Sequence, residues 1–347
     1  MDKEFKIAIF LVGFLLLISA LLLEFLAEIH FLSIPFLLGF LPFSVYLIPY
    51  ILLSTEQGIL NLQKFIFPAS WKKFLFPLFL LSIYSIFSIA SSTFNPTLFI
   101  KLGLWLILPT FLFTKNIIFS ELTSSSTPNV GSGDKCSLRD WVGVLLLWLP
   151  IEFGALSGFD ITFKPGLTIP ALPFVAVIQG LYLFRILRNL PQIGYDFLWN
   201  FKDLKIAFLA LFLLAFSLIP LGTQMGFIQF SFTPPSFGET VKLILGIYFL
   251  VAIPEELLFR GLIQNLLFKS FNGKVPWFLV LSTASIIFGF SHWNNFTPAD
   301  IRYVFLASLA GLGYGFVYFK TGKTTISALV HCGVNFFWAI CFPGTQG

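Results

Sequence analysis

The stretch VKLILGIYFLVAIPEELLFRGLIQNLLF, residues 241–268, is long and apolar, yet it carries two glutamates and an arginine near its centre. A helix needs about 20 predominantly apolar residues to span a bilayer. A charge at bilayer depth costs ~2.5 kcal/mol or more. The stretch therefore predicts a membrane helix. Glu255, Glu256 and Arg260 are expected to have structural or functional roles that explain why charges are kept inside it.

The composition of the whole chain indicates the same class of protein. Of its 347 residues, 57% are hydrophobic, 11% are charged and 47 are Phe, and the mean hydropathy is +0.91. A soluble domain cannot bury this much apolar surface, whereas a bilayer solvates it. The net charge of +5 is spread over short loops and gives no nucleic-acid-binding patch. The three cysteines lack the spacing of a disulfide framework or a structural zinc site.

Continuous apolar runs, rather than alternating ones, favour membrane helices over the strands of a β-barrel. We therefore expect an all-α polytopic membrane protein with about eleven transmembrane helices. The first run is longer than the core of a signal peptide, and no small-residue cleavage site follows it, so we expect it to be retained. The expected spans are residues 7–27, 31–54, 74–92, 98–114, 141–157, 171–187, 206–223, 241–268, 275–293, 302–319 and 325–342.

The distribution of basic residues predicts the orientation of these spans. With the N-terminus in the cytoplasm, most Lys and Arg residues fall in cytoplasmic loops, as the positive-inside rule requires. On the opposite side, only Lys164 and Arg302 lie in loops, while Lys101 and Lys242 lie at helix entrances. We expect a multi-pass integral protein, in a bacterial cell membrane, with its N-terminus in the cytoplasm.

Two polar or irregular stretches, residues 124–135 and 223–240, interrupt the apolar pattern. They favour two parts of the chain. We expect residues 1–200 to form an N-terminal multi-span region with no assigned role. Residues 201–347 would form a second domain that carries the unusual charges.

Helical geometry separates the two adjacent glutamates. Glu256 and Arg260 are four residues apart, so they share a helix face and can form an ion pair. Glu255 is rotated by ~100° from Glu256 and points elsewhere. Pro254 lacks a backbone N–H and is expected to push Ile253 out of helical geometry, which would kink the helix just before the glutamates.

Two further polar sites occur in later spans. His292 follows Phe288 by four residues, and His331 precedes Asn335 by the same step, so each pair shares a helix face. Any one of these groups taken alone has an ordinary structural explanation, such as a bond to a backbone carbonyl. Together they exceed what the ion pair requires, and ionisable groups inside a membrane are functional candidates.

Three short motifs, EELLFR at 255–260, FGFSH at 288–292 and HCGVN at 331–335, occur in this order. They resemble the EExxxR, FxxxH and HxxxN motifs of the CPBP family, which comprises CAAX proteases and bacteriocin-processing proteases of membranes. The resemblance covers the C-terminal part of the chain only. It implies a hydrolase that carries out proteolysis inside the membrane, a glutamate-type intramembrane endopeptidase.

The resemblance also implies roles for the motif residues. Glu255 and His292 would activate the attacking water. His331 and Asn335 would stabilise the oxyanion. This chemistry suits the residue types, because a carboxylate can act as a general base and imidazole and carboxamide groups can donate to an oxyanion. The residues expected to support the site are Glu256, Arg260 and Phe288.

Alternatives remain open at this stage. Glu255, His292 and His331 could form a three-ligand zinc site, but the HExxH helix of zinc proteases is absent, so we favour a mechanism with no cofactor. A proton- or cation-coupled transporter would use similar residues, and broken helices in inverted repeats would favour it. A catalytically idle bacteriocin-immunity or scaffold protein would retain the same fold. The expected partners are the lipid bilayer and a peptide or membrane-protein substrate, which we favour over a prenylated CAAX peptide.

Overall fold

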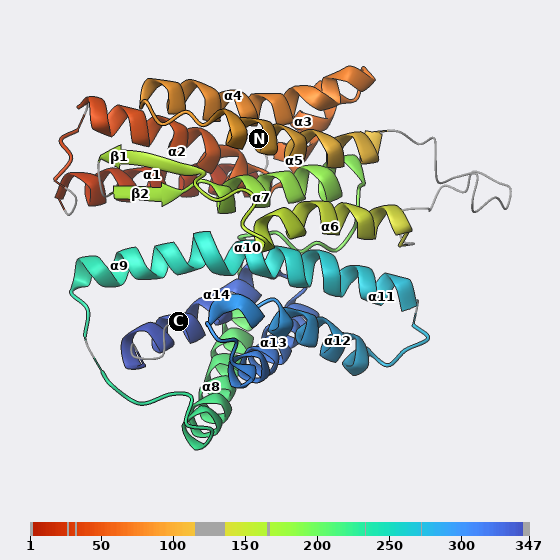
Figure 1. The fold of residues 1–347 in the computed structure, drawn as a ribbon. Coiled ribbons are helices and arrows are strands. Elements are labelled where there is room, and N and C mark those ends of the chain that lie inside the picture. The colour runs from red at the N-terminus through yellow and green to blue at the C-terminus, as the bar shows by residue number, and fades with distance from the viewer. Residues whose placement is uncertain are drawn as a thin grey trace, which may run out of the picture. The chain divides into compact units, whose positions relative to one another are not determined.

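The structure is a computed structural model that describes residues 3–25, 28–31, 33–114, 136–164, 167–232, 234–271 and 273–342. It is mostly helical, at 77%. The chain divides into two compact units, Met1–Pro191 and Gln192–Gly347, which are described separately (Figure 1). The polar stretch 124–135 lies outside the described residues.

The first unit is built from helices and one hairpin. Two of its helices begin at side chains that cap free backbone N–H groups: Ser33 accepts from Phe36 at the start of α2, and Thr55 accepts from Gly58 at the start of α3. The elements are α1 (Lys3–Phe25), α2 (Ile34–Leu52), α3 (Glu56–Ile66), η1 (Ser70–Phe74), α4 (Leu75–Ala90), α5 (Pro96–Thr114), α6 (Leu138–Glu152), β1 (Asp160–Lys164), β2 (Leu167–Pro170), α7 (Leu172–Gly180) and η3 (Leu181–Leu187).

The hairpin is a departure from the predicted all-α class. Strands β1 and β2 pair antiparallel, with Ile161 opposite Ile169 and Thr162 opposite Thr168. Their β-branched residues suit strands, but the runs are too short to stand out among membrane spans. The hairpin packs against α2, where a Cβ on Gly39 would lie 2.2 Å from the ring of Phe163. The close approach therefore requires a glycine at this position.

The second unit holds all the predicted site residues. Helix α8 begins with a capping box, in which Asn200 accepts from the backbone N–H of Asp203 at 3.0 Å. The elements are α8 (Phe201–Gln224), α9 (Phe237–Gly246), η4 (Ile247–Ala252), α10 (Ile253–Glu256), η5 (Leu257–Gln264), α11 (Asn265–Phe271), α12 (Trp277–Phe290), η6 (Trp293–Asn295), α13 (Ile301–Thr321) and α14 (Thr324–Cys341).

From α9 to α11 the chain forms one helical run, which lies along one side of the second unit in Figure 1. The predicted kink before the glutamates is wrong, because Ile253 is helical, with φ −62° and ψ −50°. The segments η4 and η5, on either side of Pro254, are π-helical. A π-helix is wider than an α-helix and often occurs at functional sites. This widening accommodates the proline, which has no N–H to donate, without breaking the run.

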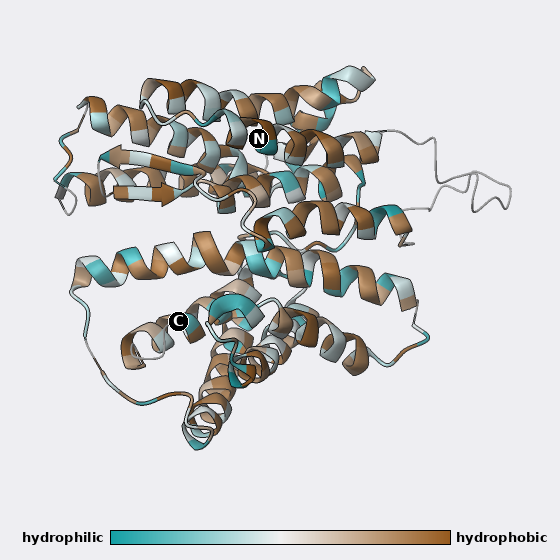
Figure 2. Ribbon diagram, in the orientation of Figure 1, coloured by the Kyte–Doolittle hydropathy of each residue, from teal (hydrophilic) through white to brown (hydrophobic). Residues whose placement is uncertain are grey.

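Seven helices in the described residues are long and apolar enough to cross a membrane, so the protein is a polytopic membrane protein. They are Lys3–Glu24, Ile34–Leu52, Ser70–Ala90, Pro96–Thr114, Phe201–Gln224, Ile301–Thr321 and Thr324–Cys341. The other four expected spans are helical too, but α6, α12 and the α7–η3 segment are shorter, and the run α9–α11 is divided by its π-helical turns. The number eleven stays a prediction. Figure 2 shows many hydrophobic residues along the helices of both units, as helices in contact with lipid require.

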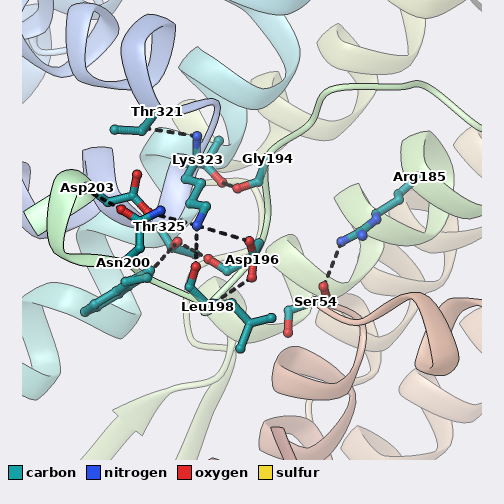
Figure 3. Close-up of polar contacts among 12 residues, drawn as sticks. Ser54, Arg185, Gly194, Asp196, Leu198, Asn200, Asp203, Thr321, Lys323 and Thr325 are labelled. Carbon is teal, nitrogen blue, oxygen red and sulfur yellow. Dashed lines mark hydrogen bonds and ion pairs between the residues drawn. The ribbon is translucent and has the colours of Figure 1, made fainter. Parts of the chain in front are cut away.

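A polar cluster fixes the start of α14 within the second unit (Figure 3). The Lys323 Nζ atom lies 2.9 Å from Asp203 Oδ2 and 3.5 Å from Asp196 Oδ2. The Tyr248 hydroxyl donates to the Thr325 carbonyl at 3.1 Å. These contacts join α14 both to the start of α8 and to η4, so they set the position of the polar residues that lie further along α14.

Candidate active site

One glutamate lies at the centre of a buried hydrogen-bond network. Glu256 and Arg260 are both fully buried, and the Arg260 Nε atom donates to Glu256 Oε2 at 3.0 Å. The same oxygen lies 2.6 Å from the Ser327 hydroxyl, while Glu256 Oε1 lies 3.0 Å from His331 Nδ1. The ion pair predicted from the four-residue spacing is therefore present, and the same carboxylate also holds a histidine of α14.

The neighbouring glutamate has a different environment. Glu255 Oε2 lies 3.9 Å from the Nε2 atoms of both His292 and His331. Among the described residues this oxygen has no hydrogen-bond partner, because 3.9 Å is too long for a direct bond. The Glu255 side chain is 31% exposed, whereas Glu256 is fully buried. As predicted, adjacent positions on the helix give one paired carboxylate and one that is not in the pair.

His292 is oriented by the end of its own helix. It lies just after α12, and its Nδ1 atom is 2.9 Å from the Phe288 carbonyl oxygen. A carbonyl only accepts hydrogen bonds, so Nδ1 carries a proton, and Nε2 is the ring nitrogen that faces Glu255. The Ser291 hydroxyl is 3.2 Å from the same Nδ1 atom.

The Phe288 ring joins the parts of the site. It is buried, and its centroid lies 4.7 Å from that of His292 and 5.7 Å from that of His331. The Arg260 guanidinium carbon lies 5.0 Å from the same centroid, a cation–π distance. The predicted supporting role of Phe288 thus has a contact basis, since one ring touches both imidazoles and the buried cation.

A glycine allows α12 to pack closely on α13 just before His292. At Gly289 an added Cβ would lie 2.6 Å from the Val304 carbonyl oxygen. A glycine there allows the two helix backbones to approach, as small residues do in membrane helix pairs.

The second unit contains a cavity of about 570 Å³ next to the polar residues. Its wall includes His292, His331 and Asn335, which places the second member of the predicted HxxxN pair beside the histidines. Most of the remaining wall is apolar or aromatic and comes from α8, α9, α13 and α14, including Tyr303 and Trp338. A mainly apolar pocket with a few converging polar groups is the usual form of a ligand site.

Next to the cavity, Arg302 ties the start of α13 to the end of α8. Its Nη1 atom donates to the Met225 carbonyl at 3.1 Å and to the Gly226 carbonyl at 3.2 Å. Its Nη2 atom donates to Asp300 Oδ2 at 2.6 Å. The hydrogen bond from Arg302 lowers the pKa of Asp300 below its ordinary value, so the pair stays ionised at neutral pH. These contacts fix two of the helices that form the cavity wall.

The sequence reasoning missed two residues of this site. Ser327 lies beside Glu256, and the Tyr314 ring stacks on the His331 ring with centroids 4.6 Å apart and an interplanar angle of 13°. A signal for Ser327 was available, because it precedes His331 by four residues and shares its helix face. Nothing in the spacing of Tyr314 indicates its role, since α13 meets α14 only through tertiary packing.

The described residues contain no group of three or more His, Cys, Asp or Glu side chains arranged to hold a metal ion. The zinc alternative would have used Glu255 and the two histidines. Glu255 Oε2 lies 3.9 Å from the Nε2 atom of each histidine, and His331 Nδ1 contacts Glu256.

The chain is a polytopic helical membrane protein whose second unit brings two imidazoles and a carboxamide to one cavity and places the Glu255 carboxylate beside both imidazoles. The family can be given more closely. Residues 237–337, which include every predicted site residue, match the family of Rce1-like proteins described as type II CAAX prenyl endopeptidase. This C-terminal part of the chain belongs to that CAAX protease family, as the three motifs predicted. No curated protein and no solved structure matches the chain.

Proposed function

We propose that the protein is an intramembrane endopeptidase that hydrolyses a peptide bond with a water molecule activated by Glu255 and His292. Membership of the CAAX protease family suggests a peptidase that acts on peptides. The observation that carries the mechanism is the position of Glu255 Oε2, which lies 3.9 Å from the Nε2 atoms of His292 and His331, two histidines that line the cavity.

The geometry suits activation of water. Two acceptors form no hydrogen bond with each other, but one water molecule that donates to both can bridge them across 3.9 Å. Glu255 Oε2 and His292 Nε2 both accept, so the water donates a hydrogen to each and keeps its lone pairs for the peptide carbonyl. One of the two acceptors takes a proton as the oxygen attacks. General-base catalysis of this kind contributes roughly 10²–10⁴-fold to a rate.

His331 and Asn335 are proposed to stabilise the oxyanion. They are four residues apart on α14 and both line the cavity. Asn335 donates through its amide. His331 already donates Nδ1–H to Glu256, so it donates Nε2–H to an oxyanion only when both ring nitrogens carry protons. The Glu256 carboxylate, 3.0 Å from Nδ1, supplies the compensating negative charge. Such donors act strongly in a site from which water is largely excluded.

The cavity indicates the substrate class. Its volume of about 570 Å³ is within the range of roughly 300–1,000 Å³ found for ligand pockets. Its wall is mainly apolar, so we propose a peptide or a membrane-protein segment with apolar side chains next to the cleaved bond. The polar groups gather at one part of the wall, where the carbonyl to be attacked would lie.

The proposal is tested by comparing membrane and secreted peptides, quantitatively, between cells that carry wild-type protein and cells that carry Glu255→Gln. Peptide fragments produced by the protein should be lost in the variant while their uncut precursors accumulate. Glu152→Gln is a matched control, since Glu152 ends α6 and accepts from Trp148 Nε1 at 3.0 Å far from the site in sequence. Identical peptide profiles for wild type and Glu255→Gln would contradict the enzyme and favour a transporter or an idle scaffold.

A further inference from the structure

Helix α3 lies between two candidate spans, Ile34–Leu52 and Ser70–Ala90. It has 11 residues and carries both Glu56 and Lys64, so it is too short and too polar to cross a bilayer, which takes about 20 apolar residues. A short helix between two spans lies at a membrane surface. This placement does not depend on the proposed peptidase function.

The side chains of α3 and η1 are apolar on their outer side as well as on their inner side. Ile59 and Ile66 are buried within the first unit. On the outer side Phe65 is 53% exposed and Trp71 is 62% exposed, and Leu60 and Phe67 are exposed too. Aromatic residues that point outward from a short amphipathic helix are typical of elements that lie in the membrane interface.

Lysines stand directly over these outward-facing rings. The Lys72 Nζ atom lies 5.7 Å from the centroid of the Phe65 ring, and the Lys73 Nζ atom lies 5.5 Å from that of the Phe67 ring. Lys64 adds a third positive charge on α3. Each ammonium group is thus next to an aromatic ring. Such a pair suits the boundary between acyl chains and headgroups, where the ring contacts the acyl chains and the ammonium group contacts the phosphates.

This surface is held in place at both ends by η3 within the first unit. Arg185 Nη1 donates to the carbonyls of Leu53 and Ser54 at the end of α2, at 3.1 Å and 3.3 Å. Figure 3 shows the contact between Arg185 and Ser54. Arg185 Nη2 lies 2.9 Å from Glu56 Oε1. At the other end, the Tyr182 hydroxyl donates to the Lys73 carbonyl.

The charge balance of this surface is positive. Glu56 is the single acidic residue from 56 to 74 in the sequence, and its carboxylate faces Arg185. The three lysines therefore offer their charges to a partner outside the chain. We propose that α3 and η1 form a binding site for anionic phospholipid headgroups, with the phosphate on Lys72 and Lys73 and the aromatic rings in the upper part of the acyl chains.

The test measures lipid binding by the full chain in bilayer nanodiscs of phosphatidylcholine with or without phosphatidylglycerol. Native mass spectrometry counts the phosphatidylglycerol that stays bound on transfer to detergent. A basic residue near a membrane surface contributes about fivefold to binding of anionic lipid, so reversing Lys72 and Lys73 to Glu should weaken retention at least tenfold. Higher salt should weaken it as well.

A control separates this site from an effect of net charge. Reversing the exposed Lys101 and Lys242 to Glu changes the net charge equally and should leave retention unchanged. Equal losses in both variants, or no preference of wild type for phosphatidylglycerol, would overturn the proposal. If the Lys72→Glu, Lys73→Glu double variant does not fold, Lys72→Gln, Lys73→Gln is compared in the same way.

Depth is measured independently through Trp71. Lipids brominated near the glycerol end of the acyl chain quench nearby indoles, and the difference between wild type and Trp71→Phe reports this residue among the eight Trp of the chain. Lipids brominated near the glycerol end should quench the fluorescence of wild type more than that of the variant. Lipids brominated at the methyl end should quench the two proteins equally. Equal quenching of both proteins would place Trp71 away from the interface and overturn the proposal.

Discussion

Glu255 and Glu256 are adjacent residues of the same type, and replacement of each by glutamine should produce different defects. Glu255→Gln should stop catalysis and leave the fold intact. Glu256→Gln should lower both stability and activity. The comparison is sharp because the two variants make the same chemical change at neighbouring positions of one helix.

The cost of Glu256→Gln follows from the groups around the carboxylate. Arg260 Nε, His331 Nδ1 and the Ser327 hydroxyl all approach it as hydrogen-bond donors. A glutamine presents an NH₂ group in place of one oxygen, so a donor then faces a donor, and Arg260 loses its counter-charge. Breaking a fully buried ion pair from one side costs about 3–5 kcal/mol. For a unit of this size that corresponds to a fall in Tm of roughly 10 °C.

Glu255→Gln should not carry this cost. Its Oε2 atom has no hydrogen-bond partner among the described residues, and 31% of the side chain is exposed. Glutamine keeps the shape of the side chain but does not act as a base. Cleavage should fall by ~10²–10⁴-fold, while Tm should stay within about 2 °C of wild type.

The assay combines thermal unfolding of purified protein in detergent with the cleavage rate of an identified peptide substrate. A rescue variant tests the physical cause. Arg260→Met in the Glu256→Gln background removes the stranded charge and should recover part of the lost Tm without restoring activity. If Glu255→Gln cleaves at the wild-type rate, or the two glutamate variants have the same Tm, the proposed division of roles is refuted.

Four further outcomes are expected. His292→Ala and Asn335→Ala should unfold at the wild-type temperature but cleave about 10²-fold more slowly, as measured in the same two assays. Gly289→Ala places a Cβ 2.6 Å from a backbone carbonyl of α13 and should slow cleavage ~10–100-fold, whereas Gly246→Ala, with nothing within 4 Å of its Cβ, should stay near wild type. Strong chelation should leave the rate unchanged; activity that chelation removes and zinc restores would contradict the glutamate mechanism. A topology reporter fused after Lys135 should read cytoplasmic and one at the C-terminus external, and two reporters on one side would contradict eleven spans.

The site was predictable where it depends on one helix. A spacing of four residues predicted the Glu256–Arg260 pair, and a shift of one residue predicted that Glu255 lies outside the pair. The contacts between helices were not predictable in this way. That Glu256 also holds His331 and that Tyr314 stacks on the same ring depend on how α10, α13 and α14 pack, and periodicity within a helix carries no information on this.

The fold was predictable at the level of hydrophobic runs. In the described residues each of the eleven apolar segments contains helix, because a long apolar segment in a bilayer must satisfy its backbone hydrogen bonds internally. The error at Ile253 has a clear cause. The steric clash with a following proline disfavours helical geometry but does not forbid it, and Ile253 keeps ordinary α-helical dihedral angles in α10. The hairpin β1–β2 was missed because its strands have five and four residues, fewer than a hydropathy pattern resolves.

The three charges in the central stretch can now be explained one at a time. Arg260 and Glu256 form a neutral pair, and the Phe288 face adds a contact that a cation favours. That pair alone has no need of a second glutamate, and replacing it with apolar side chains could leave the fold equally stable. Glu255 is the residue that packing does not require, since it lies beside two imidazoles and makes no buried hydrogen bond through Oε2 among the described residues. The pair then has a purpose of its own: Glu256 contacts the Nδ1 atom of His331 and so fixes which ring nitrogen faces Glu255. The cost of burying charge in this helix is therefore explained by the position of Glu255, and the pair is explained by the histidine that it orients.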